Sequence, residues 1–306
     1  MEAGHDPVKL LEQKKAANKY IYELYEKWLT THADTLKPKT KKDMIALWKN
    51  YVLPKIGKQR VNDIDSNDIE DLLRPIQSIY AANKVLALLS KAFNLAEKWK
   101  MRPLNSNPCK HIKKHKEHVR EEMLSNEQFA ALLEACDYFI HNGSQYENLS
   151  SKAIKCIMLT GARRNEILHA KWEYFNELHG LLHLPDSKTG AKKIALPQDV
   201  VDIINSIPRY SDYIFQSTTK EDSPIYDVKY VWAKIKQRAG VKPDLRVHDL
   251  RHNFASRLAS LGVTLHQVGE LLGHTQANTT KRYAHFFTES KREVATRVLE
   301  GVKQQQ

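Results

Sequence analysis

The sequence has little cysteine and no long apolar stretch, and these two absences exclude several classes of protein. Its three cysteines, Cys109, Cys136 and Cys156, are widely spaced and form no CxxC pair, so we expect reduced structural residues rather than a disulfide framework. No apolar run approaches the roughly 20 residues that cross a bilayer, and residues 1 to 10 lack the apolar core of a secretory signal. The sequence therefore predicts a cytoplasmic protein with no membrane partner.

The chain also lacks a phosphate-binding P-loop and a cluster of carboxylates. Three histidines, His111, His115 and His118, do fall at metal-like spacing. A metal site would need a rigid helix and a further ligand, so we interpret this stretch as a solvated segment. We expect no metal and no cofactor.

Positive charge is concentrated in the first part of the chain. Residues 1 to 120 hold 24 of the 48 Lys and Arg residues but only 14 of the 36 Asp and Glu residues, whereas the remainder is nearly balanced. This distribution favours a polyanion such as DNA as the partner. Charge alone favours equally a basic surface that only keeps the protein in solution and binds no polyanion.

The spacing of apolar residues predicts two domains joined by a basic linker. Helical periodicity covers residues 20 to 29, 44 to 52, 69 to 76 and 85 to 96, where we interpret the tryptophans as core residues. The periodicity stops at Pro103, and the polar, basic stretch that follows fits a linker lying along DNA.

The second domain is predicted to be mainly helical with one β-hairpin. Ser125 and Gln128 form an S-x-x-Q capping box that begins its first helix. Residues 180 to 185 and 194 to 197 read as two strands, with Lys188 in or beside the turn that joins them. Further helices are expected over residues 200 to 207, 228 to 239, 248 to 261 and 265 to 272, with Gly262 as a carboxy-terminal cap.

Five separated segments of this domain carry groups suited to phosphodiester chemistry. They are TGARRNE at residues 160 to 166, SKTG at 187 to 190, HDLR at 248 to 251, LLGH at 271 to 274 and KRY at 281 to 283. In this order they resemble the catalytic signature of the tyrosine recombinases, the phage integrase family. The resemblance implies a mainly α protein with a small β-hairpin or sheet, in which a helical core-binding domain and an α+β catalytic domain form a clamp around DNA.

The residue types fit the chemistry of a phosphodiester. Its transition state carries extra charge on the nonbridging oxygens, which the planar guanidinium groups of Arg163 and Arg251 can bind bidentately. A tyrosine has an ordinary pKa near 10, so Tyr283 needs a neighbour that accepts its proton, and we suggest His248. Glu166 lies one helical turn from Arg163 and is expected to orient either Arg163 or His248.

Two further roles are implied only by the resemblance. His274 would donate a hydrogen bond to the same oxygens, and Lys188 would protonate the leaving 5′ oxygen. Because Lys192 and Lys193 lie in the same hairpin, either of them remains an alternative to Lys188. Each of these residues also has an ordinary structural explanation when taken singly.

The resemblance also suggests how the chain is divided. We expect residues 1 to 15 to be a remnant of an arm-binding domain, 16 to 103 a core-type DNA-binding domain, 104 to 122 the linker, 123 to 290 the catalytic domain and 291 to 306 a tail helix. Double-stranded DNA is the expected partner. Candidate DNA contacts are the lysines at two basic clusters: Lys37, Lys39, Lys41, Lys42, Lys113, Lys114 and Lys116.

The expected function is site-specific recombination that integrates or excises a mobile element, by a monomer that forms a tetramer on two DNA sites. The tail helix would dock on a neighbouring subunit, with packing on its own domain as the alternative. Whether accessory DNA-bending proteins are needed is left open. Two rival functions are a non-catalytic helix-turn-helix regulator, suggested by residues 264 to 284, and a type IB topoisomerase.

Overall fold

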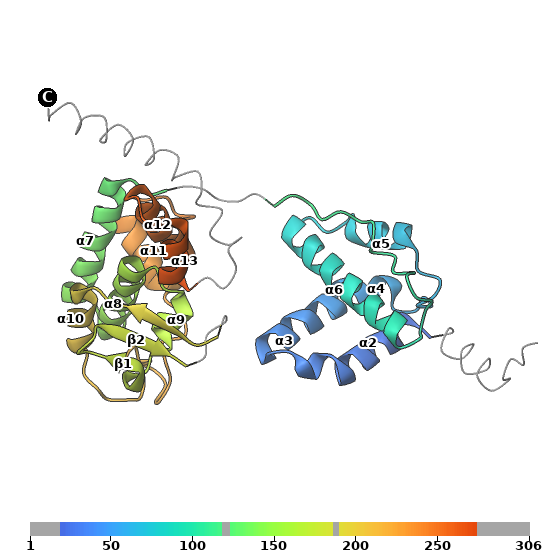
Figure 1. Ribbon diagram of the computed structural model, residues 1–306, viewed down its shortest axis with the longest axis horizontal. Coiled ribbons are helices and arrows are strands. Elements are labelled where there is room, and N and C mark those ends of the chain that lie inside the picture. The colour runs from blue at the N-terminus through green and yellow to red at the C-terminus, as the bar shows by residue number, and fades with distance from the viewer. Residues whose placement is uncertain (1–18, 118–122, 186–189, 274–306) are drawn as a thin grey trace, which may run out of the picture. The chain divides into compact units, whose positions relative to one another are not determined.

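The computed structural model describes residues 19–117, 123–185 and 190–273. The chain divides into two compact units, residues 1 to 120 and 121 to 306, each with its own buried core (Figure 1). The fold class expected from the sequence, mainly helical with a small sheet, is confirmed. No helix in the described ranges is long and apolar enough to cross a membrane.

Helices build the first unit. They are α2 (Ile21–Thr31), α3 (Pro38–Leu47), α4 (Leu53–Ile56), α5 (Ser66–Leu73) and α6 (Ile79–Lys98), with a 3-10 turn at Ala33–Thr35 and a π-helical turn at Trp48–Val52. Pro38 at the first position of α3 and the Asp65–Asp68 capping box of α5 explain where these helices begin. Of the predicted core tryptophans, Trp28 and Trp48 are fully buried, with their ring centres 6.0 Å apart, whereas Trp99 is partly buried at the edge of the core.

Beyond α6 the described chain to residue 117 contains no helix or strand. It is nevertheless held against the first unit. Asn83 of α6 donates a hydrogen bond to the His115 carbonyl at 2.9 Å and accepts one from the His115 amide at 2.9 Å. Among the described residues no group of histidines, cysteines and carboxylates could hold a metal ion.

The described part of the second unit contains seven helices and a small sheet. The helices are α7 (Asn126–Asn142), α8 (Gln145–Thr160), α9 (Arg164–Leu168), α10 (Gln198–Asn205), α11 (Lys229–Arg238), α12 (Val247–Ser260) and α13 (Leu265–Leu272). The Ser125–Gln128 capping box is confirmed, because each of the two residues donates a backbone hydrogen bond to the other's side chain. The three cysteines are free and buried, as expected.

The sheet is antiparallel in the order β1 (Phe175–Asn176), β2 (Leu181–Leu184) and β3 (Lys192–Ala195), preceded by a 3-10 turn at Trp172–Tyr174. The predicted hairpin is present, but its second strand begins at Lys192 rather than Ile194, and the two-residue strand β1 was not predicted. The backbone pairing of Lys192 with Leu184 extends the strand beyond its apolar residues. Lys192 therefore belongs to a strand and not to the turn.

The start of the second unit is tied to helix α12. The Leu124 amide donates to the Asn253 side chain at 2.5 Å, and Arg257 donates to the carbonyls of Leu124 and Ser125 at 3.2 and 3.0 Å. Arg257 also donates to the side chain of Asn126 at 2.6 Å. The first residues after the linker region are thus fixed to a helix more than a hundred residues later in the chain.

Candidate active site

Arg163 stands at a turn that two sequence features produce. Helix α8 ends at Gly161, whose φ of 62° is in the left-handed region that suits glycine, and α9 begins three residues later. Arg163 is the residue that precedes α9. Its amide donates to one oxygen of Glu166 at 2.9 Å, and its guanidinium Nη1 donates to the other at 2.8 Å. The expected proximity of Glu166 to Arg163 is therefore present.

Arg251 comes from the middle of α12 and is 4% exposed. Its Nη1 donates to the carbonyl of Gly161 at 2.9 Å, and its Nη2 donates to the carbonyl of Leu272 at 2.7 Å. These two carbonyls belong to the ends of α8 and α13, where backbone acceptors lack partners within the helix. Arg251 thus satisfies two helix ends while its side chain is held beside the turn that carries Arg163.

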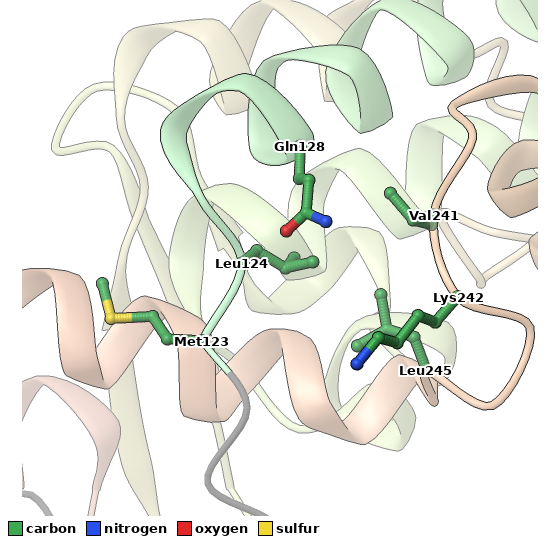
Figure 2. Close-up of a pocket in the computed structure, with 6 residues that line it drawn as sticks. All are labelled: Met123, Leu124, Gln128, Val241, Lys242 and Leu245. Atoms are coloured by element: carbon green, nitrogen blue, oxygen red, sulfur yellow. The ribbon is translucent and has the colours of Figure 1, made fainter.

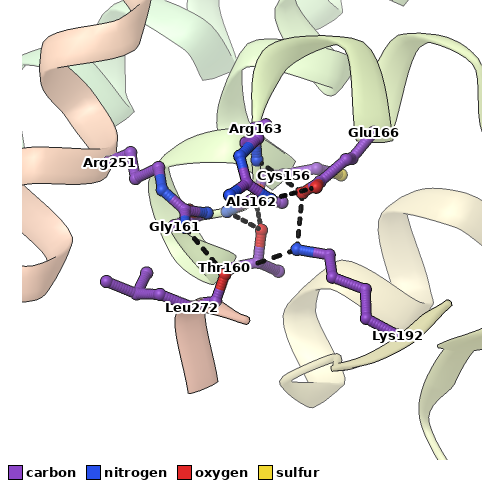
Figure 3. A network of polar contacts seen from close by, with 9 residues as sticks. All are labelled: Cys156, Thr160, Gly161, Ala162, Arg163, Glu166, Lys192, Arg251 and Leu272. Carbon is purple, nitrogen blue, oxygen red and sulfur yellow. Dashed lines mark hydrogen bonds and ion pairs between the residues drawn. The ribbon is translucent and has the colours of Figure 1, made fainter. Parts of the chain in front are cut away.

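Lys192 is the hairpin lysine that enters the site. Its Nζ lies 2.6 Å from a Glu166 oxygen and 3.5 Å from the Leu272 carbonyl, and only 9% of its side chain is exposed. Figure 3 shows the Glu166 carboxylate between the side chains of Lys192 and Arg163. Lys193 is exposed. Lys188 lies outside the described residues; of the two described hairpin lysines, Lys192 is the one in contact with the site.

His248 lies one turn before Arg251 on α12, and its ring is 5.2 Å from that of His252. The residue is exposed to solvent as a whole. Partial desolvation nevertheless lowers the pKa of His248, and the charge of Arg251 lowers it further. The imidazole is therefore mainly neutral at pH 7, the form that can accept a proton.

The charges of the cluster formed by Arg163, Glu166, Lys192 and Arg251 do not balance, because three cations face one carboxylate. Burial alone would raise the pKa of Glu166, but hydrogen bonds from Lys192 and Arg163 outweigh it and the pKa is lowered. Burial lowers the pKa of Lys192, against the opposite effect of its hydrogen bond to Glu166. With Glu166 ionised, the cluster retains an excess positive charge that suits a phosphate group.

The other predicted site residues fall into two groups. His274 and Tyr283 lie outside the described residues; the described chain ends at Gly273, which caps α13 with a φ of 66°. The lysines proposed to contact DNA are in the first unit. All are exposed except Lys41, which is partly buried and forms an ion pair with Asp34 at 2.6 Å.

A separate pocket of about 190 Å³ lies between the start of α7 and the segment that precedes α12. Figure 2 shows the side chains that line it: Met123, Leu124, Gln128, Val241, Lys242 and Leu245. None of the predicted catalytic residues is among them. The pocket does not contribute to the candidate active site.

Solved structures share this fold. An integrase of the transposon Tn1549, bound to transposon right end DNA, has a TM-score of 0.75 at 17% identity over 92% of this chain and 100% of that chain. Lambda integrase residues 75–356, a dimer bound to a core site, has a TM-score of 0.67 at 19% identity over 85% of this chain and 97% of that chain.

Sequence relatives point the same way. A shufflon-specific DNA recombinase of Escherichia coli is 30% identical over 206 residues, which are 65% of this chain but only 49% of that protein. A tyrosine recombinase of Thermosipho africanus is 24% identical over 89% of this chain and 96% of its own length. The phage integrase central domain matches residues 22–115. Because residues 122–290 match the phage integrase family itself, the chain belongs to that family, the tyrosine recombinases that its motifs resemble.

Proposed function

We propose that this protein is a site-specific DNA recombinase that cuts and rejoins strands through a 3′-phosphotyrosyl intermediate on Tyr283. The observation that carries the proposal is the convergence of Arg163 and Arg251, which come from separate motifs, at one site beside Lys192. Both arginines also affect the pKa of His248, so the proposed base lies within their electrostatic reach.

The two arginines would bind the nonbridging oxygens of the scissile phosphate. Their anchors are in place before DNA binds: Arg163 is held by Glu166, and Arg251 by the carbonyls of Gly161 and Leu272. Fixed cations stabilise the charge that develops in a pentacoordinate transition state without reorganising during the reaction. We assign His274 a further hydrogen bond to the same oxygens.

The cleavage step forms one bond and breaks one. The Tyr283 oxygen attacks phosphorus, and its proton passes to neutral His248. The bond from phosphorus to the 5′ oxygen breaks, and that oxygen takes a proton from Lys188 to leave as a 5′-hydroxyl. In the reverse direction the 5′-hydroxyl of another strand attacks phosphorus and releases Tyr283. Since one phosphoester bond replaces another, the cycle needs no ATP, and we propose that it uses neither a metal nor another cofactor.

The proposed partner is double-stranded DNA, bound by residues 16 to 103, by the linker over 104 to 122 and by the catalytic domain over 123 to 290. Lysines 37, 39, 41, 42, 113, 114 and 116 would contact phosphates. Solved lambda integrase structures, which share the fold, include a tetramer bound to a Holliday junction. We propose the same assembly here, with residues 291 to 306 docking on the neighbouring subunit. A DNA substrate also favours the cytoplasmic location that the sequence predicts.

Two rival functions are less well supported. A helix-turn-helix regulator does not explain why Arg163, Glu166 and Arg251 are held together in one site. A type IB topoisomerase would use a similar set of groups on a single DNA site. Recombination between paired sites separates the two enzymatic functions, and integration or excision of a mobile element is the biological outcome that we propose.

The first test is to incubate the wild type and Tyr283→Phe with nicked duplexes from the flanks of the DNA element that encodes the protein. In a nicked duplex the short fragment that carries the new 5′-hydroxyl diffuses away after cleavage. Religation then cannot occur, so the covalent intermediate accumulates. We expect a protein–DNA adduct that survives SDS with the wild type and none with Tyr283→Phe. Specific binding of these duplexes by the wild type without an adduct would favour the regulator.

A further inference from the structure

Lys192 lies where three segments of the second unit meet. It projects from β3 toward Glu166 of α9 and toward the last residues of α13 (Figure 3). Lys192 shares both of its partners with the arginines. Glu166 also accepts a hydrogen bond from Arg163, and the Leu272 carbonyl also accepts one from Arg251. A single ammonium group therefore touches the groups that hold both arginines.

The strand geometry explains why Lys192 and not Lys193 occupies this place. Side chains alternate along a strand, so Lys192 shares a face with the buried Ile194, while Lys193 shares the exposed face with Ala195. The pairing of Ile194 with Leu182 fixes this register. A shift of one residue would exchange the two lysines and also expose Ile194, which makes the inward position of Lys192 well determined.

The stem of Lys192 packs on the end of α13. A Cβ atom added to Gly273 would lie 2.8 Å from Lys192 Cδ, closer than two carbon atoms can approach. Gly273 precedes His274 in the chain. Lys192 is therefore in contact with the backbone from which the proposed phosphate-binding histidine emerges.

We propose that Lys192 is a positioning residue for phosphoryl transfer, holding Glu166 and the Leu272 carbonyl so that both arginines keep their orientation. The inference rests on the proposed function. In this assignment Lys192 acts through Glu166 and Leu272 rather than on the DNA, and the proton for the leaving oxygen comes from Lys188. Its ammonium forms an ion pair with the Glu166 carboxylate at 2.6 Å.

The test compares Lys192→Met, Lys192→Arg and Lys193→Met in the full chain. Methionine keeps an unbranched stem without the charge, arginine keeps a cation, and Lys193 is the adjacent exposed control. Each variant is given two nicked duplexes, one with the natural 5′ oxygen at the scissile bond and one with sulfur in its place. A thiol has a pKa of about 8.5, so the sulfur leaves without a proton donor. The measurement is the single-turnover rate of adduct formation at saturating enzyme.

We expect Lys192→Met to lose about 100-fold on both duplexes, the scale of a misplaced catalytic group. Lys192→Arg should recover a part of this loss. Lys193→Met should react within about twofold of the wild-type rate, a small change beside the loss of about 100-fold expected for a misplaced group. If sulfur restores the rate of Lys192→Met, Lys192 is itself the proton donor and the inference is overturned. An unimpaired Lys192→Met overturns it as well.

The double variant Glu166→Gln with Lys192→Met covers the case in which Lys192→Met does not fold, because it leaves no unpaired charge within this ion pair. If Lys192 acts through Glu166, the double variant should cleave both duplexes at about the rate of Glu166→Gln alone, because the two changes remove the same interaction. A further loss of about tenfold or more would overturn the inference by showing an independent role. A wild type that forms no adduct would instead overturn the proposed function.

Discussion

Arg251 Nη1 donates a hydrogen bond of 2.9 Å to the backbone carbonyl of Gly161, 90 residues earlier in the chain. The contact joins the helix that carries His248 to the turn that carries Arg163. The acceptor is a backbone atom of a glycine whose left-handed φ and close contact with Phe254 exclude a side chain at residue 161. Arg251 must in addition reach two carbonyls at once.

Replacing Arg251 with lysine should therefore reduce catalysis strongly. A lysine has one ammonium group and cannot span the carbonyls of Gly161 and Leu272 while also facing a phosphate. We expect the rate of adduct formation to fall at least about 100-fold. Arg238→Lys, at an exposed arginine of α11, is the matched control and should leave the rate unchanged. Equal rates for Arg251→Lys and the wild type would contradict a role in the reaction.

The pH dependence of cleavage should reflect neutral His248. Burial and the charge of Arg251 place its pKa below the ordinary value of 6.5, so the imidazole is mainly deprotonated from pH 8 down to about 7. We expect the single-turnover rate to be level over that range and to decline only at lower pH, as His248 gains a proton. His248→Gln should lack this decline and react more slowly throughout. A rate that already falls between pH 8 and 7 would argue against His248 as the base.

Glu166→Gln should destabilise the second unit in a pH-dependent way. Removing the carboxylate takes away the buried charge that Glu166 places beside the Lys192 ammonium, at a cost of about 3 kcal/mol near pH 7. Because the folded-state pKa of Glu166 is lowered, its contribution is complete above 4.5 and is lost as the pH falls through that lowered value. Thermal unfolding should show a difference between the variant and the wild type that shrinks below pH 4.5. A difference that is constant with pH would mean that the charge of Glu166 is unimportant.

Two glycines allow backbone strain to be separated from a side-chain collision. Gly262 and Gly273 have φ values of 82° and 66°, so alanine at either should cost about 1 to 2 kcal/mol of stability. A Cβ at Gly262 meets nothing within 4 Å, whereas one at Gly273 collides with Lys192. We therefore expect similar melting temperatures for the two variants but slow cleavage only for Gly273→Ala. Equal cleavage rates would show that the contact with Lys192 has no catalytic consequence.

The linker lysines should determine much of the salt dependence of DNA binding. Lys113, Lys114 and Lys116 are exposed, and each lysine that no longer binds a phosphate lowers the slope of log K against log salt by about 1. The triple change to glutamine should therefore reduce the slope by about 3. Lys220→Gln, at an exposed loop of the second unit, is the control. An unchanged slope in the triple variant would place these lysines away from DNA.

The order of the motifs in the sequence was sufficient to find the parts of the site that side-chain identity defines. Arg163, Glu166, His248 and Arg251 were selected because they stand in ordered motifs that resemble the tyrosine-recombinase signature and carry groups suited to phosphodiester chemistry. The structure describes the two arginines and Glu166 in one cluster. The helical periodicity likewise predicted α13 at its observed bounds, residues 265 to 272.

Other features have no signature in the sequence. The acceptors of Arg251 are main-chain carbonyls, which every residue possesses, so no pattern distinguishes Gly161 or Leu272 as partners. Strand β1 has only two residues and is too short to show alternation. The choice among the hairpin lysines did have a signal: counting back two residues from apolar Ile194 leads to Lys192 on the same face.

The hydrogen bonds that join Asn253 and Arg257 of α12 to residues 124 to 126 have a mechanical consequence. A pull on the chain at Met123 would act at once on α12, the helix that carries His248 and Arg251, because Leu124 is bonded to it directly. Tension in the linker, of the kind that bending of a bound duplex would produce, would thus reach the catalytic helix before it reaches the sheet.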